Sequence, residues 1–207
     1  MKFETAHSQT LRDLLTWRRD TRHFRPDAVS QDALQELQSA MELAPSVGNA
    51  RPWRVLSVTS PEKRSQVRSE FQRCNAVAET QYDDKAKAEY RKLKLAGLDI
   101  APVQLAVFTD TAPNEGRGLG RHSMPETLEQ STAMAIFSLW LMARSHNLGV
   151  GMVSILDPKK IEAIFDAPDT WRFSAYLCIG HPSFLDDTPL LHKVDWQKNT
   201  DTVWAEV

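Results

Sequence analysis

A segment spanning residues 125–147 has the spacing of a helix, but its middle is apolar on nearly every side. The residues that produce this pattern are Ala133, Ala135, Ile136, Leu139, Trp140, Leu141 and Met142. Pro125 suits a first helical position, and Leu148-Gly149 is typical of a helix stop. A helix with so little polar surface must be buried on several sides. The sequence therefore predicts a central helix or a helix at a subunit interface, and we favour a homodimer.

Helical and strand patterns alternate along the rest of the chain. The predicted strands are residues 53–59, 102–109 and 175–180, and the last two are nearly continuous apolar runs. Thr10 and Ser30 are suited to cap two helices whose apolar faces point to the core. These faces consist of Leu11, Leu14 and Leu15 in one helix and of Leu34, Leu37 and Met41 in the other. We predict an α+β fold with a mixed sheet flanked by helices, in a single domain of residues 1–207.

Two polar helices and a C-terminal extension complete the predicted domain. The helices cover residues 62–78 and 85–98, and the second is dense in Lys and Arg, so it is a candidate lid over a site. Residues 181–207 have no clear periodicity, yet they contain Trp196 and Trp204, which a disordered tail would rarely carry. We expect this extension to wrap the partner subunit.

Composition excludes several classes of function. The chain of 207 residues is 42% hydrophobic and 25% charged, as is ordinary for one globular domain. A net charge of -2 disfavours nucleic acid as a partner, so any anion site must be local. No apolar run approaches a membrane span and no signal peptide is evident, so we expect a cytoplasmic protein without membrane partners. Cys74, Cys178 and the six histidines lack metal-ligand spacing, so we expect no metal.

A cluster of charges lies at the end of the first predicted helix. Arg18, Arg19 and Arg22 flank Asp20 and Thr21. The planar guanidinium forms two parallel hydrogen bonds to phosphate oxygens and stays charged at any working pH. A carboxylate repels phosphate, so Asp20 either neutralises its neighbours or points toward the reacting part of a ligand. The cluster predicts a site for an anion.

Two further clusters have the composition of ligand-binding loops. Residues 44–53 join a helix to a strand, and Gly48 there permits close approach while Ser46 and Asn49 offer hydrogen bonds to a flat heteroaromatic edge. The alternative for these residues is a simple connecting loop. Residues 149–154 place two glycines before a short strand, which leaves room for a planar ligand, and Ser154 is the polar exception there.

In their order along the chain, these three clusters resemble those of the nitroreductase-like flavoproteins, and the likeness spans most of the chain. Within this family the pattern is closer to the 5,6-dimethylbenzimidazole synthases, because Asp20 stands where ordinary nitroreductases usually have Ser. Further likeness lies in residues 90–97, 101–103, 119–121, 124–125 and 177–180. The resemblance implies an FMN-binding fold assembled as an intertwined homodimer with two FMN sites at the interface.

The resemblance also implies an enzyme that consumes a flavin. Reduced FMN is the substrate, and with molecular oxygen it is fragmented to 5,6-dimethylbenzimidazole, the lower ligand of vitamin B12, and erythrose 4-phosphate. A separate NAD(P)H-dependent flavin reductase is the expected source of reduced FMN. No metal takes part.

The residues that the resemblance places at the flavin are Arg18, Arg19, Asp20, Thr21, Arg22, Ser46, Asn49, Leu95 and Ser154. The arginines contact the phosphate and ribityl region, while Leu95 in the lid-like helix covers the ring. We expect Asp20 to transfer protons during fragmentation. A hydroxyl donates or accepts hydrogen bonds, so Ser154 is expected to orient the flavin or to stabilise a peroxide.

Two other functions are compatible with the same residues. The chain is alternatively an FMN-dependent NAD(P)H nitroreductase or flavin reductase, which needs an open site where nicotinamide stacks on a retained flavin. A further alternative is a non-catalytic flavin-binding protein, from which FMN would be recovered intact after reduction and aeration.

Overall fold

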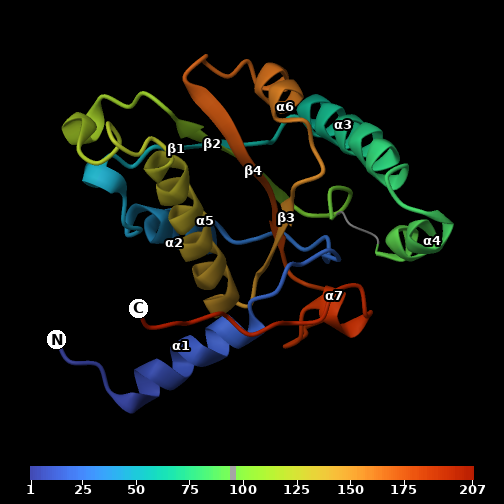
Figure 1. Cartoon of the computed structure of the whole chain (residues 1–207), viewed down its shortest axis with the longest axis horizontal. Helices are drawn as coiled ribbons and strands as arrows, with labels where there is room; N and C mark the ends of the chain where they lie inside the picture. Colours follow the sequence, from blue (N-terminus) through green and yellow to red (C-terminus); the bar gives the residue numbers. More distant parts are fainter. Residues whose placement is uncertain (94–96) are drawn as a thin grey trace.

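The computed structural model, which describes residues 1–93 and 97–207, contains a four-stranded sheet (Figure 1). The strands are β1 (Trp53–Ser57), β2 (Val103–Asp110), β3 (Gly149–Val153) and β4 (Trp171–Gly180), in the order β1-β2-β4-β3. The α+β class is confirmed, but all three strand pairs are antiparallel, whereas a mixed sheet was expected. Apolar runs indicate burial on both faces and do not fix strand direction. A parallel pairing occurs as an isolated bridge between Asp20 and Val150.

Helices cover both faces of this sheet (Figure 1). They are α1 (Thr5–Trp17), α2 (Gln31–Glu42), α3 (Pro61–Glu79), α4 (Asp84–Lys92), α5 (Thr127–Ser145), α6 (Pro158–Ile164) and α7 (Leu190–Lys193), with 3-10 helices η1 (Val47–Asn49) and η2 (Glu115–Gly118). One apolar cluster joins α2 and α5 to the sheet, and a second joins α3 and α6 to its other face. Within the described residues, no helix is long and apolar enough to cross a membrane.

Strand β4 shows why the central strands read as continuous apolar runs. Leu177 and Ile179 belong to the cluster with α5, while Tyr176 and Cys178 belong to the cluster with α3 and α6. All four are fully buried, because successive side chains of a strand point to opposite faces. A strand between two helical layers is therefore expected to be apolar on both of its faces.

Helix α5 is the central helix that the sequence predicts. It begins at Thr127 rather than at Pro125, and Leu139 is buried against the sheet with 2% of its surface exposed. The stop precedes Gly149, since Asn147 adopts φ 59° and the Leu148 N–H then bonds the Ala143 carbonyl at 2.8 Å. Asn tolerates this left-handed conformation at a helix end.

One side of α5 stays exposed in the single chain. Met134 and Phe137 each keep 41% of their surface accessible, although both lie in the apolar middle of the helix. Apolar composition on all sides therefore predicts more burial than one copy of the chain provides.

Helix α1 departs from the prediction at its start and on its apolar face. It begins at Thr5, where Glu4 and His7 form a reciprocal capping box, and the Thr10 hydroxyl donates to the Ala6 carbonyl instead of capping. No residue of α1 is buried, and Leu11 and Leu15 are 49% and 42% exposed. A periodic pattern identifies an apolar face but not what covers it. The prediction for α2 is confirmed in contrast, with its Ser30 cap and buried core side chains.

The predicted lid helix is α4, and it is shorter than expected. It ends at Lys92, while residues 98–100 form a turn. The prediction for Leu95 lies outside the described residues. Basic side chains gather in the last turn of α4, where they complement the helix dipole.

The C-terminal extension packs on α4 before it leaves the surface. The Trp196 ring lies 5.5 Å from Tyr82 and 6.3 Å from Tyr90, measured between centroids. Residues 197–207 are exposed throughout, and the C-terminus runs back toward α1 (Figure 1). The part of the extension up to Trp196 thus contacts its own chain.

Replacing Tyr176 with phenylalanine should lower the free energy of unfolding by about 1–2 kcal/mol. The buried hydroxyl donates to Gln104 Oε1 at 2.7 Å, and Gln104 Nε2 donates to the Leu98 carbonyl at 2.9 Å. Removing the hydroxyl leaves a buried amide oxygen without a donor. Urea unfolding measures the loss, and a Tyr176→Phe protein as stable as wild type would contradict this role.

Candidate functional site

Residues 18–22, called the arginine segment below, lie along the edge of β3 that no other strand of the sheet occupies. The Thr21 N–H bonds the Val150 carbonyl at 2.9 Å, and the Met152 N–H bonds Asp20 Oδ1 at 3.0 Å. A Cβ on Gly151 would overlap the backbone oxygen of Thr21, and a Cβ on Gly149 would overlap the Thr21 side chain. The room beside the two glycines is therefore filled by Thr21, whereas the sequence suggested a planar ligand there. Glycine spacing indicates close approach but not the approaching group.

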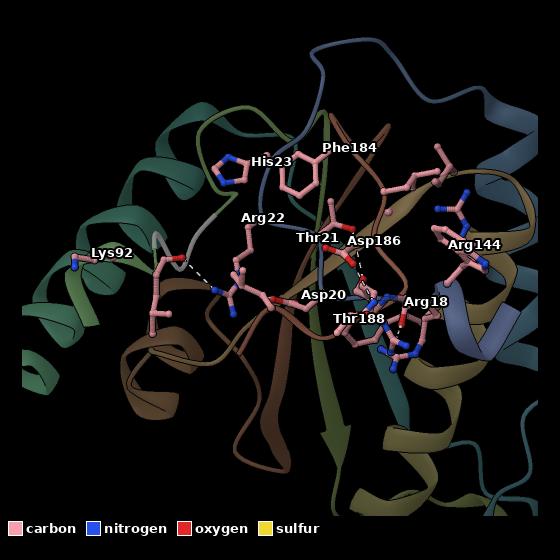
Figure 2. A pocket seen from close by; sticks show the side chains of 18 residues that line it. Arg18, Asp20, Thr21, Arg22, His23, Lys92, Arg144, Phe184, Asp186 and Thr188 are labelled. Atoms are coloured by element: carbon pink, nitrogen blue, oxygen red, sulfur yellow. Dashed lines mark hydrogen bonds and ion pairs between the residues drawn. The ribbon is translucent and has the colours of Figure 1, made fainter. Parts of the chain in front are cut away.

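A cavity of about 210 Å³ opens beside this segment (Figure 2). It lies among the end of α1, the ends of α4 and α5, the start of β3 and the chain after β4. The residues that line it are Trp17, Arg18, Arg19, Asp20, Thr21, Arg22, His23, Lys92, Leu93, Trp140, Arg144, Leu148, Gly149, Phe184, Leu185, Asp186, Thr188 and Leu190. The structure thus brings all five residues of the predicted anion cluster into one cavity.

Arg18 projects its guanidinium over aromatic rings. The central carbon lies 5.0 Å from the Trp140 ring centroid and 5.8 Å from that of Phe137. Burial lowers the pKa of Arg18 and the neighbouring Arg19 lowers it further, while Asp20 opposes both. No ion pair neutralises Arg18 among the described residues, so this cation remains available to a ligand.

Asp20 and Arg22 form an ion pair at the other side of the cavity. Arg22 Nε lies 3.1 Å from Asp20 Oδ2, and Arg22 Nη1 donates to the Leu93 carbonyl at 3.1 Å. The second Asp20 oxygen accepts from the Met152 N–H. Both oxygens are thus held, and 39% of the side-chain surface stays accessible. This arrangement gives a fixed, accessible carboxylate at the junction of β3 and the candidate lid.

Arg19 is engaged by the chain that follows β4. Its Nε and Nη2 donate to the Asp187 carbonyl at 3.0 and 2.6 Å, and its Nη1 donates to the Arg18 carbonyl at 3.2 Å. These bonds place Arg19 as a link between the anion cluster and the C-terminal part of the chain. Its capacity to hold a ligand is correspondingly smaller than that of Arg18.

Three other predicted site residues that the structure describes, Ser46, Asn49 and Ser154, lie outside this cavity. Ser154 follows β3 directly and is exposed, two residues beyond the Met152 N–H that bonds Asp20. Ser46 accepts from the Arg51 N–H at 3.1 Å, and Asn49 is exposed at φ 55°; both precede β1. Ser154 is therefore close in sequence to the Asp20 contact, whereas one chain does not bring Ser46 and Asn49 to the cavity.

Sequence reasoning missed several contributors to the cavity, from the C-terminal extension and from α5. Phe184 and Asp186 come from the extension, which carries no periodic signal. Arg144 carries the one charge between residues 130 and 145, at the end of an apolar helix. That isolated charge was a signal, because a cation in an apolar helix needs a polar partner.

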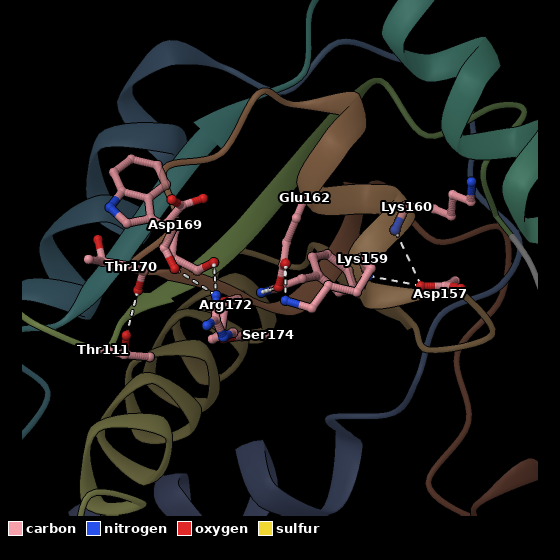
Figure 3. A network of polar contacts seen from close by, with 11 residues as sticks. Thr111, Asp157, Lys159, Lys160, Glu162, Asp169, Thr170, Arg172 and Ser174 are labelled. Carbon is pink, nitrogen blue, oxygen red and sulfur yellow. Dashed lines mark hydrogen bonds and ion pairs between the residues drawn. The ribbon is translucent and has the colours of Figure 1, made fainter.

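A second polar network lies on α6 and the start of β4 (Figure 3). Glu162 accepts from Lys159 Nζ at 2.7 Å and from the Phe173 N–H at 3.1 Å, and its pKa is lowered by these contacts against the opposing effect of burial. Arg172 donates to the Asp169 carbonyl at 2.7 Å. Glu162 is paired with Lys159 and bonded to the backbone of β4, so this network holds α6 to the sheet, while Arg172 donates to a backbone carbonyl. In the described part of the chain, no group of three His, Cys, Asp or Glu is placed to hold a metal.

Comparison with known sequences gives relatives that extend over nearly the whole chain. A 5,6-dimethylbenzimidazole synthase of Rhodobacter capsulatus is 54% identical over 204 residues, which is 99% of this chain and 99% of the relative. A 5,6-dimethylbenzimidazole synthase of Rhodospirillum rubrum is 45% identical over 195 residues, 94% of this chain and 92% of the relative.

Solved structures show the same fold at lower sequence identity. The crystal structure of oxidised iodotyrosine deiodinase bound to FMN and 3-iodo-L-tyrosine superimposes with a TM-score of 0.75 at 21% identity, covering 95% of this chain and 99% of that one. A model of the Nitroreductase family matches residues 15–181. These residues include the arginine segment, the sheet and α5. The chain therefore belongs to the nitroreductase family.

Proposed function

We propose that this protein fragments reduced FMN with molecular oxygen to give 5,6-dimethylbenzimidazole and erythrose 4-phosphate. The observation that carries this function is the 45–54% identity, over nearly the full length, to relatives named 5,6-dimethylbenzimidazole synthase. It is an oxidoreductase in which the flavin is substrate as well as ligand. We place it in the cytoplasm, supplied with reduced FMN by a separate NAD(P)H-dependent flavin reductase.

The cavity supports this proposal through the chemistry of its side chains. Arg18 is a half-buried cation without an ion pair in the described residues, which fits the phosphate of FMN. Asp20 is a fixed carboxylate on the accessible side of the same segment, which fits a group that moves protons on the bound flavin. Ser154 would orient the ring from the end of β3. Arg19 and Arg22, whose donors already have acceptors, would position the segment and complete the phosphate and ribityl contacts.

We further propose that the active form is a homodimer. Exposed apolar side chains on α1 and α5 support it, among them Leu11, Leu15, Met134 and Phe137. A second copy would cover these faces, receive the extension after Trp196, and bring Ser46 and Asn49 to the flavin. Light scattering coupled to size exclusion should give twice the 23.5 kDa chain mass. A monomeric mass in protein that makes product would contradict the proposed dimer.

The decisive experiment starts from FMN photoreduced without air. Purified protein is added, oxygen is admitted, and 5,6-dimethylbenzimidazole is sought by liquid chromatography with mass detection. We expect product in amounts that scale with protein and are absent without it. Intact FMN after incubation with folded, flavin-bound protein would reject the proposed reaction.

A second candidate function is an NAD(P)H-dependent nitroreductase or flavin reductase, which the family match favours. It predicts that NAD(P)H reduces the bound FMN and that a nitroaromatic reoxidises it. Photoreduction in the experiment above bypasses NAD(P)H, so product formation there separates the two functions.

A further inference from the structure

Arg144 is a buried cation without a counter-charge. It lies in the last turn of α5 with 9% of its surface exposed, and burial lowers its pKa. The one side-chain hydrogen bond of Arg144 in the described part of the chain runs from Nη2 to Asn147 Oδ1, at 2.9 Å, and there the guanidinium takes part in no ion pair. A neutral amide accepts one of the five N–H donors of the guanidinium and supplies no charge. The side chain is thus poorly compensated for its burial.

The cavity holds a second cation without an ion pair in the described residues, the half-buried Arg18. Arg18 stacks on Trp140, a residue of α5 one helical turn before Arg144, and all three line the cavity (Figure 2). The other two arginines differ, because Arg22 is paired with Asp20 and Arg19 donates to the Asp187 carbonyl. Arg22 thus has an ionic partner and Arg19 a doubly bonded carbonyl, whereas Arg18 has no ion pair in the described residues and Arg144 has one neutral amide acceptor.

One buried and one half-buried cation beside the same cavity favour an anion with several acceptor oxygens as their ligand. The carboxyl end of the α5 dipole compensates Arg144 only in part, because its field is weak and falls off within the last turn. Lining carboxylates do not replace an anion, since Asp20 bonds Arg22 and Met152, and Asp186 bonds Lys193. A phosphate monoester offers up to two charges and three free oxygens, which matches two guanidinium forks.

We propose that Arg144 binds the phosphate of the flavin together with Arg18, an assignment that rests on the proposed function of the cavity. Arg18 comes from the segment on β3, whereas Arg144 comes from the central helix. The phosphate would then bridge two elements that are far apart in sequence. Arg144 would be the more rigidly placed of the two, since α5 is packed against the sheet and against α2.

The test compares FMN with riboflavin, which lacks the phosphate, in wild type and in Arg144→Gln. Quenching of flavin fluorescence gives both dissociation constants. A charge-assisted hydrogen bond to phosphate is lost, so the dissociation constant for FMN should rise about 10- to 150-fold. The constant for riboflavin should change less than about twofold. Arg172→Gln is the matched control, because it removes an arginine outside the cavity whose guanidinium donates to a backbone carbonyl.

Two results would overturn the assignment. Equal losses for FMN and riboflavin would mean that Arg144 acts on the fold, and unchanged FMN binding would mean that it does not touch the phosphate. If Arg144→Gln fails to fold, Arg144→Lys keeps the charge without the planar fork, and an intermediate loss confined to FMN is then expected.

A measurement without flavin separates this assignment from the proposed function. Inorganic phosphate should raise the melting temperature of wild type and should raise that of Arg144→Gln much less. If wild type binds phosphate through Arg144 but neither flavin, the flavin function fails while the phosphate site stands. If wild type binds FMN no more tightly than riboflavin, the flavin site stands while the phosphate assignment fails.

Discussion

Replacing Asp20 with asparagine should lower the rate of 5,6-dimethylbenzimidazole formation by about 100-fold or more while FMN still binds. The side chain keeps its shape, and its amide oxygen can still accept the Met152 N–H that holds Asp20 Oδ1 at 3.0 Å. What is lost is a group that can take up and release protons at this fixed position. Single-turnover product formation from photoreduced FMN measures the effect, and fluorescence quenching measures binding.

Asp27→Asn is the control for this variant. Asp27 pairs with Arg25 at 3.3 Å, is largely exposed and lies outside the cavity, so its replacement removes one carboxylate without touching the site. Product formation should stay at the wild-type rate. Full product from an Asp20→Asn protein that binds FMN normally would rule out proton transfer by Asp20 and leave it a positioning role beside Arg22.

Replacing Gly151 with alanine should destabilise the protein by about 3 kcal/mol or more and abolish flavin binding. The new methyl group would overlap the backbone oxygen of Thr21, and 3.7 Å away it would meet the ring of Phe24. No rotamer change relieves a clash with backbone, so the segment must move off β3. The Thr21–Val150 hydrogen bond and the position of Asp20 would both be lost. Urea unfolding and FMN titration report the two effects.

Gly149→Ala provides the matched comparison. There the added methyl group meets the side chain of Thr21, including Cγ2 at 2.8 Å, and not its backbone. A second substitution, Thr21→Ala, removes Oγ1 and Cγ2 but keeps Cβ, which the added methyl group would meet at 2.9 Å, so it should restore part of the stability of Gly149→Ala. The same second substitution should restore nothing in Gly151→Ala. Wild-type stability of Gly151→Ala would show that the arginine segment does not need its close contact with β3.

The central strands and α5 could be predicted because their signals are local. Residues 102–109 and 175–180 are nearly all apolar, as expected when helices cover both faces, and the structure shows apolar side chains of both strands in the clusters on the two faces of the sheet. The Ser30 cap likewise depends on its own helix alone. Strand direction was not predictable in this way, since the same apolar run serves parallel and antiparallel neighbours.

The exposure of α1 and the role of Gly149 and Gly151 could not be predicted, because both depend on which part of the structure packs against them. Leu11 and Leu15 form an apolar stripe in sequence, but their burial depends on what is packed against them. Gly149 and Gly151 indicate close approach, and either a ligand or a chain segment satisfies that pattern. Thr21 comes from a part of the sequence remote from β3, so its arrival there is a property of the folded chain.

The arginine cluster could be predicted as a candidate site, but the different contacts of its arginines could not. Arg18 and Arg22 look alike in sequence, yet one is stacked on Trp140 and the other is paired with Asp20. Arg144 lines the cavity although it belongs to α5, a helix that the sequence identifies as part of the core. Contacts across the fold decide which cation remains free.

Strand β3 lies at the end of the sheet, and the arginine segment covers its free edge. An uncovered terminal strand offers free N–H and C=O groups to another molecule and invites aggregation. Asp20 and Thr21 bond the Met152 N–H and the Val150 carbonyl, so the segment that we propose to bind the flavin also covers this strand. Detachment of the segment would cost solubility as well as activity. A bound flavin that holds the segment in place would therefore keep the protein from aggregating.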